Sequence, residues 1–346
     1  MANRFCCGFD WPGAATADLD KIFNSVSGQY TIDSGTGRFG NSLRNAPVGP
    51  GETISLYPGF THQTWVVGWA FKITAMPTTY RALVGFWDSG TAQCYVRVTT
   101  GGQFQFVGPG GVLATSANAI LMNVWYYAEV KVTIGGAGVG NYELRINGSS
   151  VGWIPSAVGD TKTTGNTSAN GIYWQALPYS AAYSYWDDIY ICDGVDGTAT
   201  QGATNADFKG DCRVDCYAPS GNGSNSGWTG SDADQVDNFE LVNDGSEATY
   251  VDATGAMIDS YAMADIPAGV IPLMTQVNMR ALKTDVAGCV LRPYVLSVGD
   301  VATGASINPG LTSVIYHEVM DLDPDTLAAW TRSTLNAAEF GIERVS

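Results

Sequence analysis

Two neighbouring stretches, NVWYYAEVKVTI (residues 123–134) and NYELRINGSSVG (residues 141–152), decide the fold of this chain. Apolar and polar residues alternate in both, which is the pattern of a strand with one buried face. Asn147-Gly148 inside the second stretch is the strongest short-range signal for a hairpin turn. We therefore predict a strand over residues 124–134, followed by a hairpin of residues 142–146 and 150–154.

The same alternation recurs between clusters of Gly, Pro, Asn and Ser, and helical periodicity is nearly absent. This pattern favours an all-β protein. A chain of 346 residues, 45% of them hydrophobic, is long enough for about two domains. A single short helix is expected late, capped by Thr331 or Ser333. The other predicted strands cover residues 64–74, 93–98, 103–107, 248–252, 271–283, 289–297 and 313–319.

The composition changes near residue 218, where APSGNGSNSGWTGSDAD (residues 218–234) is rich in Gly, Ser and Asn. Such a run is typical of a linker or a long surface loop. We therefore predict a first domain at residues 1–217, a linker or loop at 218–234, and a second, smaller β-sandwich domain at 235–346.

The acidic charge balance argues against nucleic acid as a partner. With 17 basic and 33 acidic residues the net charge is −16, so the surface repels nucleic-acid phosphates. The longest apolar runs, such as residues 65–71, fall short of the ~20 residues that span a membrane. The start, MANRFCCGFDWPG, lacks the apolar segment of a signal peptide. We expect a protein made and kept in a cytoplasm, with no membrane insertion.

Three motifs, the second made up of both opening stretches, resemble one known architecture when taken in order. GRFGNSL (residues 37–43), the two opening stretches and YWDDIYICDG (residues 185–194) are similar to the laminin-G-like, concanavalin-A-like jelly roll. The resemblance implies a jelly-roll sandwich for the first domain. Two further segments, DFKGDCRVDCYAPSGNG (residues 207–223) and DPDTLAAWTRSTLNAAEFGIERVS (residues 323–346), resemble structural proteins of tailed bacteriophages.

This second resemblance implies a non-enzymatic virion protein, displayed as a head decoration, a spike or a tail fibre. It implies assembly in the bacterial host cytoplasm with other virion proteins, as a homo-oligomer that by analogy is a trimer. Two alternatives stay open. One is a free lectin-like, carbohydrate-binding protein, and the other is a polysaccharide-degrading enzyme.

Paired carboxylates are what a glycosidase needs, and Asp187 and Asp188 are adjacent in YSYWDDIYICDG (residues 183–194). Successive strand residues point to opposite faces, so we expect these two carboxylates to diverge and to have structural roles. The glucanase string Glu-x-Asp-x-x-Glu and the Gln-x-His pattern of alginate lyases are both missing. Only His62 and His317 could serve as imidazole bases. We predict no catalytic residue, no metal site and no cofactor.

Aromatic residues offer the best candidate ligand site. Ten Trp and 17 Tyr exceed what two cores need, and several gather around a loop at residues 169–180 that we place at the sandwich rim. Sugar faces stack on such rings. The alternative is that these rings fill the core and subunit contacts. The predicted glycan-binding residues are Trp174, Tyr179, Tyr183 and Tyr185.

The seven cysteines cannot all pair within one chain. Reduced thiols are the simpler interpretation for a cytoplasmic protein. The alternative is disulfide bonding between subunits, for which the candidates are Cys6, Cys7, Cys212 and Cys216.

Overall fold

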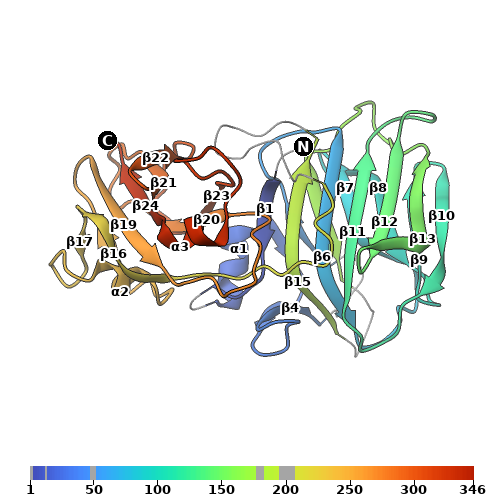
Figure 1. The fold of residues 1–346 in the computed structure, drawn as a ribbon. Helices are drawn as coiled ribbons and strands as arrows, with labels where there is room; N and C mark the ends of the chain where they lie inside the picture. The colour runs from blue at the N-terminus through green and yellow to red at the C-terminus, as the bar shows by residue number, and fades with distance from the viewer. Residues whose placement is uncertain (1–2, 12–13, 47–51, 177–182, 195–206) are drawn as a thin grey trace.

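Two β-domains lie side by side in the computed structural model, which describes residues 3–11, 14–46, 52–176, 183–194 and 207–346 (Figure 1). The first is a sandwich of two antiparallel sheets, and the second is a smaller set of antiparallel strands. The predicted fold class, a jelly-roll sandwich followed by a smaller β-domain, is confirmed.

Sheet A of the first domain has the strand order β13-β12-β11-β6-β15-β4-β3, and β1 pairs with the second half of β15. Every pairing in it is antiparallel. Its strands are β1 (Asn3–Cys7), β3 (Tyr30–Asp33), β4 (Ser42–Asn45), β6 (Thr64–Ile73), β11 (Tyr126–Thr133), β12 (Asn141–Ile146), β13 (Ser149–Val158) and β15 (Ser184–Asp193).

Sheet B packs against the inner face of sheet A and has the order β10-β9-β8-β7-β14-β5-β2. A short helical segment, η1 (Thr16–Asp18) and α1 (Leu19–Ile22), precedes its first strand. Its strands are β2 (Ser25–Ser27), β5 (Thr53–Leu56), β7 (Arg81–Asp88), β8 (Thr91–Val98), β9 (Gln103–Gly108), β10 (Gly111–Ala119) and β14 (Gly171–Gln175).

The alternation in β6 shows why these residues form a sandwich. Trp65, Trp69 and Phe71 belong to the core between the sheets. Val66 and Ala70 belong to a second apolar cluster, on the outer face of sheet A. Each fully buried large apolar side chain contributes about 1.5–3 kcal/mol relative to exposure. Both faces of this central strand are buried, so something besides sheet B covers sheet A.

The predicted hairpin is confirmed. Asn147 and Gly148 both have positive φ, 51° and 78°, and they connect β12 to β13. A two-residue turn of this kind matches the twist of the flanking strands, and its backbone favours Asn-Gly. The hairpin places β13 at the edge of sheet A.

The second domain is built on a sheet of order β16-β19-β24-β21-β22, accompanied by the pairs β17–β18 and β20–β23. The predicted late helix is confirmed as α3, with Thr331 as its N-cap. The elements are β16 (Pro219–Ser226), β17 (Thr229–Gly230), α2 (Asn238–Val242), β18 (Val251–Asp252), β19 (Met257–Met263), β20 (Gln276–Ala281), β21 (Leu291–Ser297), β22 (Asp300–Thr303), β23 (Val314–Val319), α3 (Arg332–Ala337) and β24 (Glu339–Arg344).

The segment predicted as a linker or loop, residues 218–234, instead contains β16 and β17. Its small residues have a structural reason. A Cβ on Gly223 would lie 2.4 Å from Glu339 Oε2 and 2.6 Å from Ser260 Oγ. The Glu339 carboxylate accepts hydrogen bonds from both the amide and the hydroxyl of Ser224. This Gly/Ser-rich run is therefore an edge strand that needs small side chains.

Polar contacts join the two domains. Arg280 of the second domain lies 2.8 Å from the Asp18 carboxylate. The Gln276 side chain accepts from the Cys6 amide and donates to the Cys6 carbonyl, so it extends the hydrogen bonding of β1. Among the described residues, no helix is long and apolar enough to cross a membrane.

Candidate functional site

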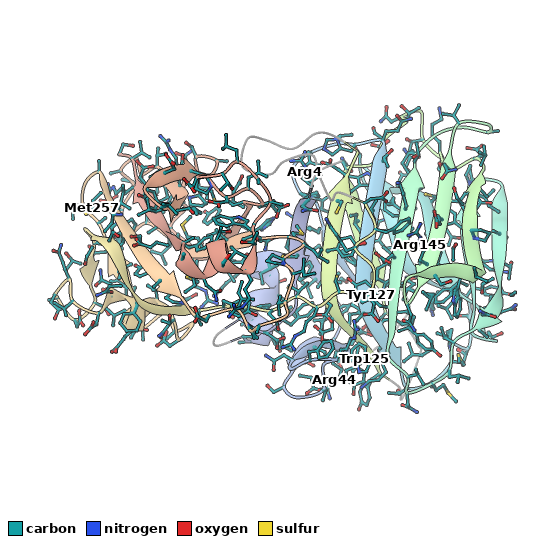
Figure 2. All side chains as sticks on the ribbon, viewed as in Figure 1. Arg4, Arg44, Trp125, Tyr127, Arg145 and Met257 are labelled. Carbon is teal, nitrogen blue, oxygen red and sulfur yellow. The ribbon has the colours of Figure 1, made fainter. Side chains whose placement is uncertain are left out.

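A row of basic and aromatic side chains crosses one end of the outer face of sheet A. Tyr185 on β15 pairs with Arg44 on β4 and with Lys72 on β6. Tyr126 pairs with Phe71, which puts the preceding Trp125 beside Lys72. We call Arg44, Lys72, Trp125, Tyr183 and Tyr185 the basic–aromatic row. Figure 2 shows Arg44 and Trp125 together at the same end of the first domain.

The cations of the row lie on its rings. Lys72 Nζ is 4.5 Å from the Tyr185 ring centroid and 4.9 Å from that of Trp125. Arg44 Cζ lies 5.1 Å above the Tyr183 ring, and the two tyrosine rings are 6.3 Å apart. Contacts of this kind attract a cation to the negative face of the ring. The side chains therefore hold one another in place across four strands.

The row is open to solvent. Tyr183 is 40% exposed, and the other members are half-buried. Arg44 Nη1 lies 3.4 Å from the Asp33 carboxylate, so its charge has a partner. Partial burial lowers the pKa of Lys72. A ligand that lies across the row would meet ring faces and two positive groups.

The predicted glycan-binding residues divide between the core and the row. Trp174 is fully buried between the sheets, contrary to the prediction of a rim position, because its strand β14 lies inside sheet B, between β7 and β5. Tyr179 lies outside the described residues. Tyr183 and Tyr185 belong to the row. Arg44, Lys72 and Trp125 were not predicted as site residues. The one sequence signal for Lys72 is a single lysine inside an apolar strand.

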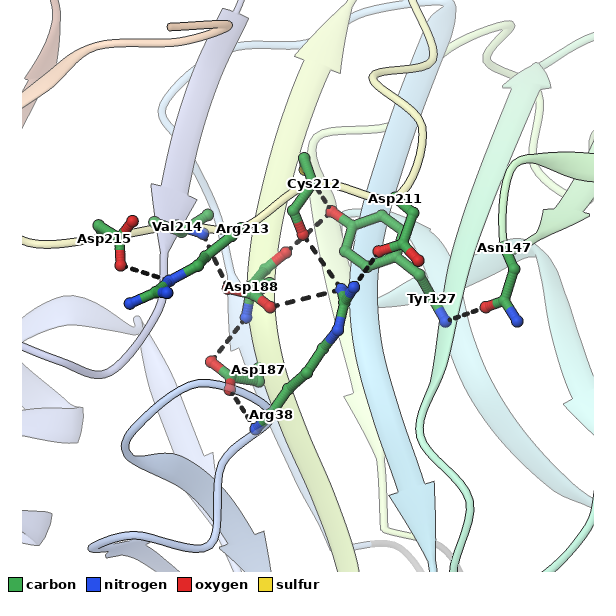
Figure 3. Close-up of polar contacts among 10 residues, drawn as sticks. All are labelled: Arg38, Tyr127, Asn147, Asp187, Asp188, Asp211, Cys212, Arg213, Val214 and Asp215. Atoms are coloured by element: carbon green, nitrogen blue, oxygen red, sulfur yellow. Dashed lines mark hydrogen bonds and ion pairs between the residues drawn. The ribbon is translucent and has the colours of Figure 1, made fainter. Parts of the chain in front are cut away.

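The carboxylates of Asp187 and Asp188 do not diverge as predicted. Asp187 pairs with Ala70 and Tyr190 pairs with Gly68, so β15 has one residue more than β6 in this interval. This β-bulge interrupts the alternation of faces, and Asp188 takes a left-handed conformation with φ of 50°. Both carboxylates therefore point toward the segments that cover sheet A (Figure 3).

Each buried carboxylate accepts amide hydrogen bonds. Asp187 accepts from the Arg38 amide at 2.9 Å and from the Asp188 amide at 2.8 Å. Asp188 accepts from the Val214 amide at 2.8 Å, and the Arg38 guanidinium lies 3.6 Å away. Burial, followed by the charge of Asp188, raises the pKa of Asp187 to about 8. Burial raises the pKa of Asp188 to about 6, although the hydrogen bond from the Val214 amide and the charge of Arg38 act to lower it.

Residues 207–217, which we call the strap, cross the outer face of sheet A on the way to β16 (Figure 1). The strap contributes Phe208 and Cys212 to the apolar cluster on this face. Arg38 donates to the Cys212 carbonyl and pairs with Asp211. Because Asp187 and Asp188 lie under the strap and the Arg38 loop, at 0% and 1% exposure, they cannot meet a polysaccharide in this structure.

A second buried carboxyl group ties the strap to the sheet. Glu129 Oε1 accepts from the Tyr190 hydroxyl at 2.5 Å and from the Gly210 amide at 2.8 Å. The Tyr190 hydroxyl in turn accepts from the Lys209 amide. Burial raises the pKa of Glu129. These contacts join residues distant in sequence, and no local pattern signals them.

The candidate disulfide cysteines lie near the strap and β1. Cys7 is buried, Cys6 and Cys212 are half-buried, and Cys216 is exposed. No cysteine is bonded to another in the described part of the chain. The burial of Cys7 removes it as a bridge to a second subunit. Bridging through the others stays a prediction.

The two histidines have structural surroundings. His62 Nε2 lies 2.9 Å from the Asp193 carboxylate, and the His317 ring packs on Phe5. Within the ranges that the structure describes, no group of three or more His, Cys, Asp or Glu residues could hold a metal.

A cavity of about 1610 Å³ lies away from the row, between the two domains. Its walls include Phe5 of the first domain, Cys212 of the strap and Met279 of the second domain. This volume exceeds the roughly 300–1,000 Å³ of small-molecule sites. It is space between facing domain surfaces, so the row is the better candidate site.

The sequence matches no protein-family model and no curated protein. Among solved structures, the chain is similar to an endo-β-1,4-glucuronan lyase from the fungus Trichoderma reesei, with 9% identity, 56% of this chain and 96% of that chain covered, and a TM-score of 0.43. It is also similar to the PL-14 alginate lyase from Aplysia kurodai, with 10% identity, 56% and 100% covered, and a TM-score of 0.40. The alginate lyase Aly36B gives 12% identity, 54% and 96% covered, and a TM-score of 0.40.

A likeness of this degree concerns the fold and transfers no activity to this chain. The comparisons nevertheless correct the leading functional hypothesis. The similar structures named above are glycan-active enzymes, and none is a virion component. The prediction of a phage structural protein was therefore wrong, because the resemblance of residues 207–223 and 323–346 to virion proteins is supported by no matching family model, curated protein or similar structure named above. The expectation that the protein is not an enzyme stays a prediction.

Proposed function

We propose that this protein binds polysaccharide chains on the outer face of sheet A, with the basic–aromatic row as the binding surface. One observation carries the proposal. The strand register brings Arg44, Tyr185, Lys72 and Trp125 into a single line across neighbouring strands. At about 4.8 Å between strands, this line is roughly 14 Å long. That length suits an oligosaccharide segment of a few units.

The chemistry of the row suits sugars. The apolar faces of pyranose rings pack on the flat faces of tryptophan and tyrosine, whose polar tips stay in water. Lysine and arginine donate hydrogen bonds to hydroxyl or acidic oxygens around the sugar ring. The side chains are already fixed by contacts with one another, which reduces the ordering cost of binding.

The geometry favours binding over paired-acid cleavage. A retaining or inverting glycosidase needs two carboxyl groups flanking the bond to be broken. Asp187 and Asp188 lie under the strap, and their oxygens accept amide hydrogen bonds. Among the described residues, the carboxylate that pairs with a member of the row is that of Asp33, and its partner is Arg44.

Affinity electrophoresis in gels that contain neutral or acidic polysaccharides tests the proposal. We expect at least one polysaccharide to retard the protein, and Trp125→Ala or Tyr185→Ala to remove at least 90% of the retardation. Tyr80→Ala is the matched control, because Tyr80 is an exposed tyrosine whose ring centroid lies 4.3 Å from Cζ of Arg97, a residue of β8 in sheet B.

The Tyr80→Ala protein should migrate like the wild type. Two results would overturn the proposal: no retardation by any polysaccharide in the panel, or equal retardation of wild type and both row variants. Circular dichroism of each variant establishes that the fold is retained.

A further inference from the structure

Lys72 differs from the other basic residues on the outer face of sheet A. Lys131 pairs with Asp207 at 3.0 Å, and Arg145 pairs with Glu143 at 2.7 Å. Arg38 pairs with Asp211. Within the described ranges, Lys72 has ring contacts but no carboxylate partner. In a chain with 33 acidic and 17 basic residues, this is an unusual position for a lysine.

The acidic groups nearest the row are already engaged. Asp33 pairs with Arg44. Asp187 follows Tyr185 by two residues, but it is buried and accepts the amides of Arg38 and Asp188. No described carboxylate is therefore left to neutralise the ammonium group between the Tyr185 and Trp125 rings.

We propose that the row takes acidic polysaccharides, and that Lys72 is the residue that recognises the carboxylate or sulfate group of one sugar unit. This inference rests on the proposed function, because it names the class of glycan that the same surface binds. Lys72 is half-buried and its ammonium group lies on two rings, so this group has lost part of its hydration. An anion placed there restores a charge partner where water has already been displaced.

The spacing of the two cations supports a chain with repeated charges. Lys72 and Arg44 lie on the strands that flank β15, so their strands are about 10 Å apart. Acidic groups on alternate units of an extended chain could meet both cations, with a sugar ring over Tyr185 between them. Arg44 keeps its Asp33 partner and therefore acts as the weaker of the two positions.

Because the protein is strongly acidic, binding of an acidic polysaccharide depends on ionic strength. A net charge of −16 repels an anionic polymer at long range, but at 0.15 M salt charges are screened beyond about 8 Å. Binding is therefore expected at physiological ionic strength and depends on the local charge at Lys72.

The test compares matched polymers at 0.15 M salt by isothermal titration calorimetry or affinity electrophoresis. The polymers are a polyuronate with its carboxyl-reduced derivative, and a sulfated glucan with its unsulfated parent. We expect at least tenfold tighter binding to the acidic member of at least one pair. The pair that shows the difference assigns the anion as carboxylate or sulfate.

Lys72→Met keeps the apolar stem and removes the charge, and it should abolish the preference. Lys131→Met removes a paired lysine from the same face and should leave the preference intact. Lys72→Arg retains a cation and should keep most of the preference.

Equal affinity for both members of both pairs, or an unchanged preference in Lys72→Met, would overturn the inference. If Trp125→Ala still abolished binding to neutral polymers in that case, the proposed function would stand without the acidic preference. Failure to bind any polymer would instead reject the proposed function itself.

Discussion

Replacing Asp187 with asparagine should change how stability depends on pH. The side chain of Asp187 is fully buried, and its folded pKa of about 8 lies well above the value of 3.8 for an exposed aspartate. Burial and the neighbouring Asp188 cause the shift. A group whose folded pKa is raised contributes most to stability below its unfolded pKa, and this contribution is lost as the pH rises toward the folded pKa.

The size of the effect follows from proton linkage. Between pH 5 and pH 7 the unfolded carboxyl group is ionised, and the folded group is mostly protonated. Each pH unit then lowers the free energy of unfolding by at most about 1.4 kcal/mol, or about 2.7 kcal/mol over the window. Asparagine can still accept from the amides of Arg38 or Asp188, but it does not titrate.

Urea unfolding at pH 5 and pH 7, followed by tryptophan fluorescence, measures the difference between Asp187→Asn and wild type. We expect the stability of the variant relative to wild type to increase by about 2–3 kcal/mol from pH 5 to pH 7. Asp300→Asn, at an exposed position on the β21–β22 hairpin, is the control. A difference that stays constant between the two pH values would show that Asp187 is ionised in the folded protein and would refute the reasoning.

Three further predictions concern packing, a helix cap and a thiol. Gly68→Ala should cost about 1–3 kcal/mol in urea unfolding, because the new Cβ would lie 2.1 Å from the Tyr190 ring; Gly165→Ala, with no atom within 4 Å, should change little. Thr331→Ala should cost about 1 kcal/mol, since the Thr331 hydroxyl caps α3; an unchanged melting temperature would contradict this. Cys216 should react with a thiol reagent before the buried Cys7, Cys94 and Cys192 in the native protein, because it is exposed, and equal rates for these four thiols would argue against the strap position.

Local signals predicted the elements that depend on neighbouring residues. The Asn147-Gly148 turn and the cap at Thr331 were both found from short motifs, because their backbone conformations are set within a few residues. The strand predicted at residues 64–74 was also found from its local pattern, and β6 covers Thr64–Ile73. These features are set by neighbouring residues and do not depend on which strands pack against them.

Features that depend on distant residues were missed. β15 has one extra residue between Asp187 and Tyr190, which changes the face to which the following side chains point. Strict alternation of buried and exposed residues does not predict such a bulge. Residues 218–226 have the composition of a loop, yet the close approach of Glu339 and Ser260 makes small residues necessary in β16. The row itself depends on the register of strands that lie up to about 140 residues apart in sequence.

The strap explains why the candidate site lies at one end of sheet A. The strap covers the outer face over β15, β6 and β11, since Gly210 and Val214 donate to Glu129 and Asp188, and Phe208 and Cys212 pack on the apolar cluster. The part of sheet A under the strap therefore contributes to stability, and the carboxyl groups of Glu129 and Asp188 are buried there. Beyond the strap the same face has the exposed ring of Tyr183, the half-buried rings of Tyr185 and Trp125, and Lys72, which has no carboxylate partner among the described residues. Glu129 Oε1 and Asp188 Oδ1 accept amide hydrogen bonds from the strap, whereas Lys72 has no carboxylate partner among the described residues and is therefore available to a ligand.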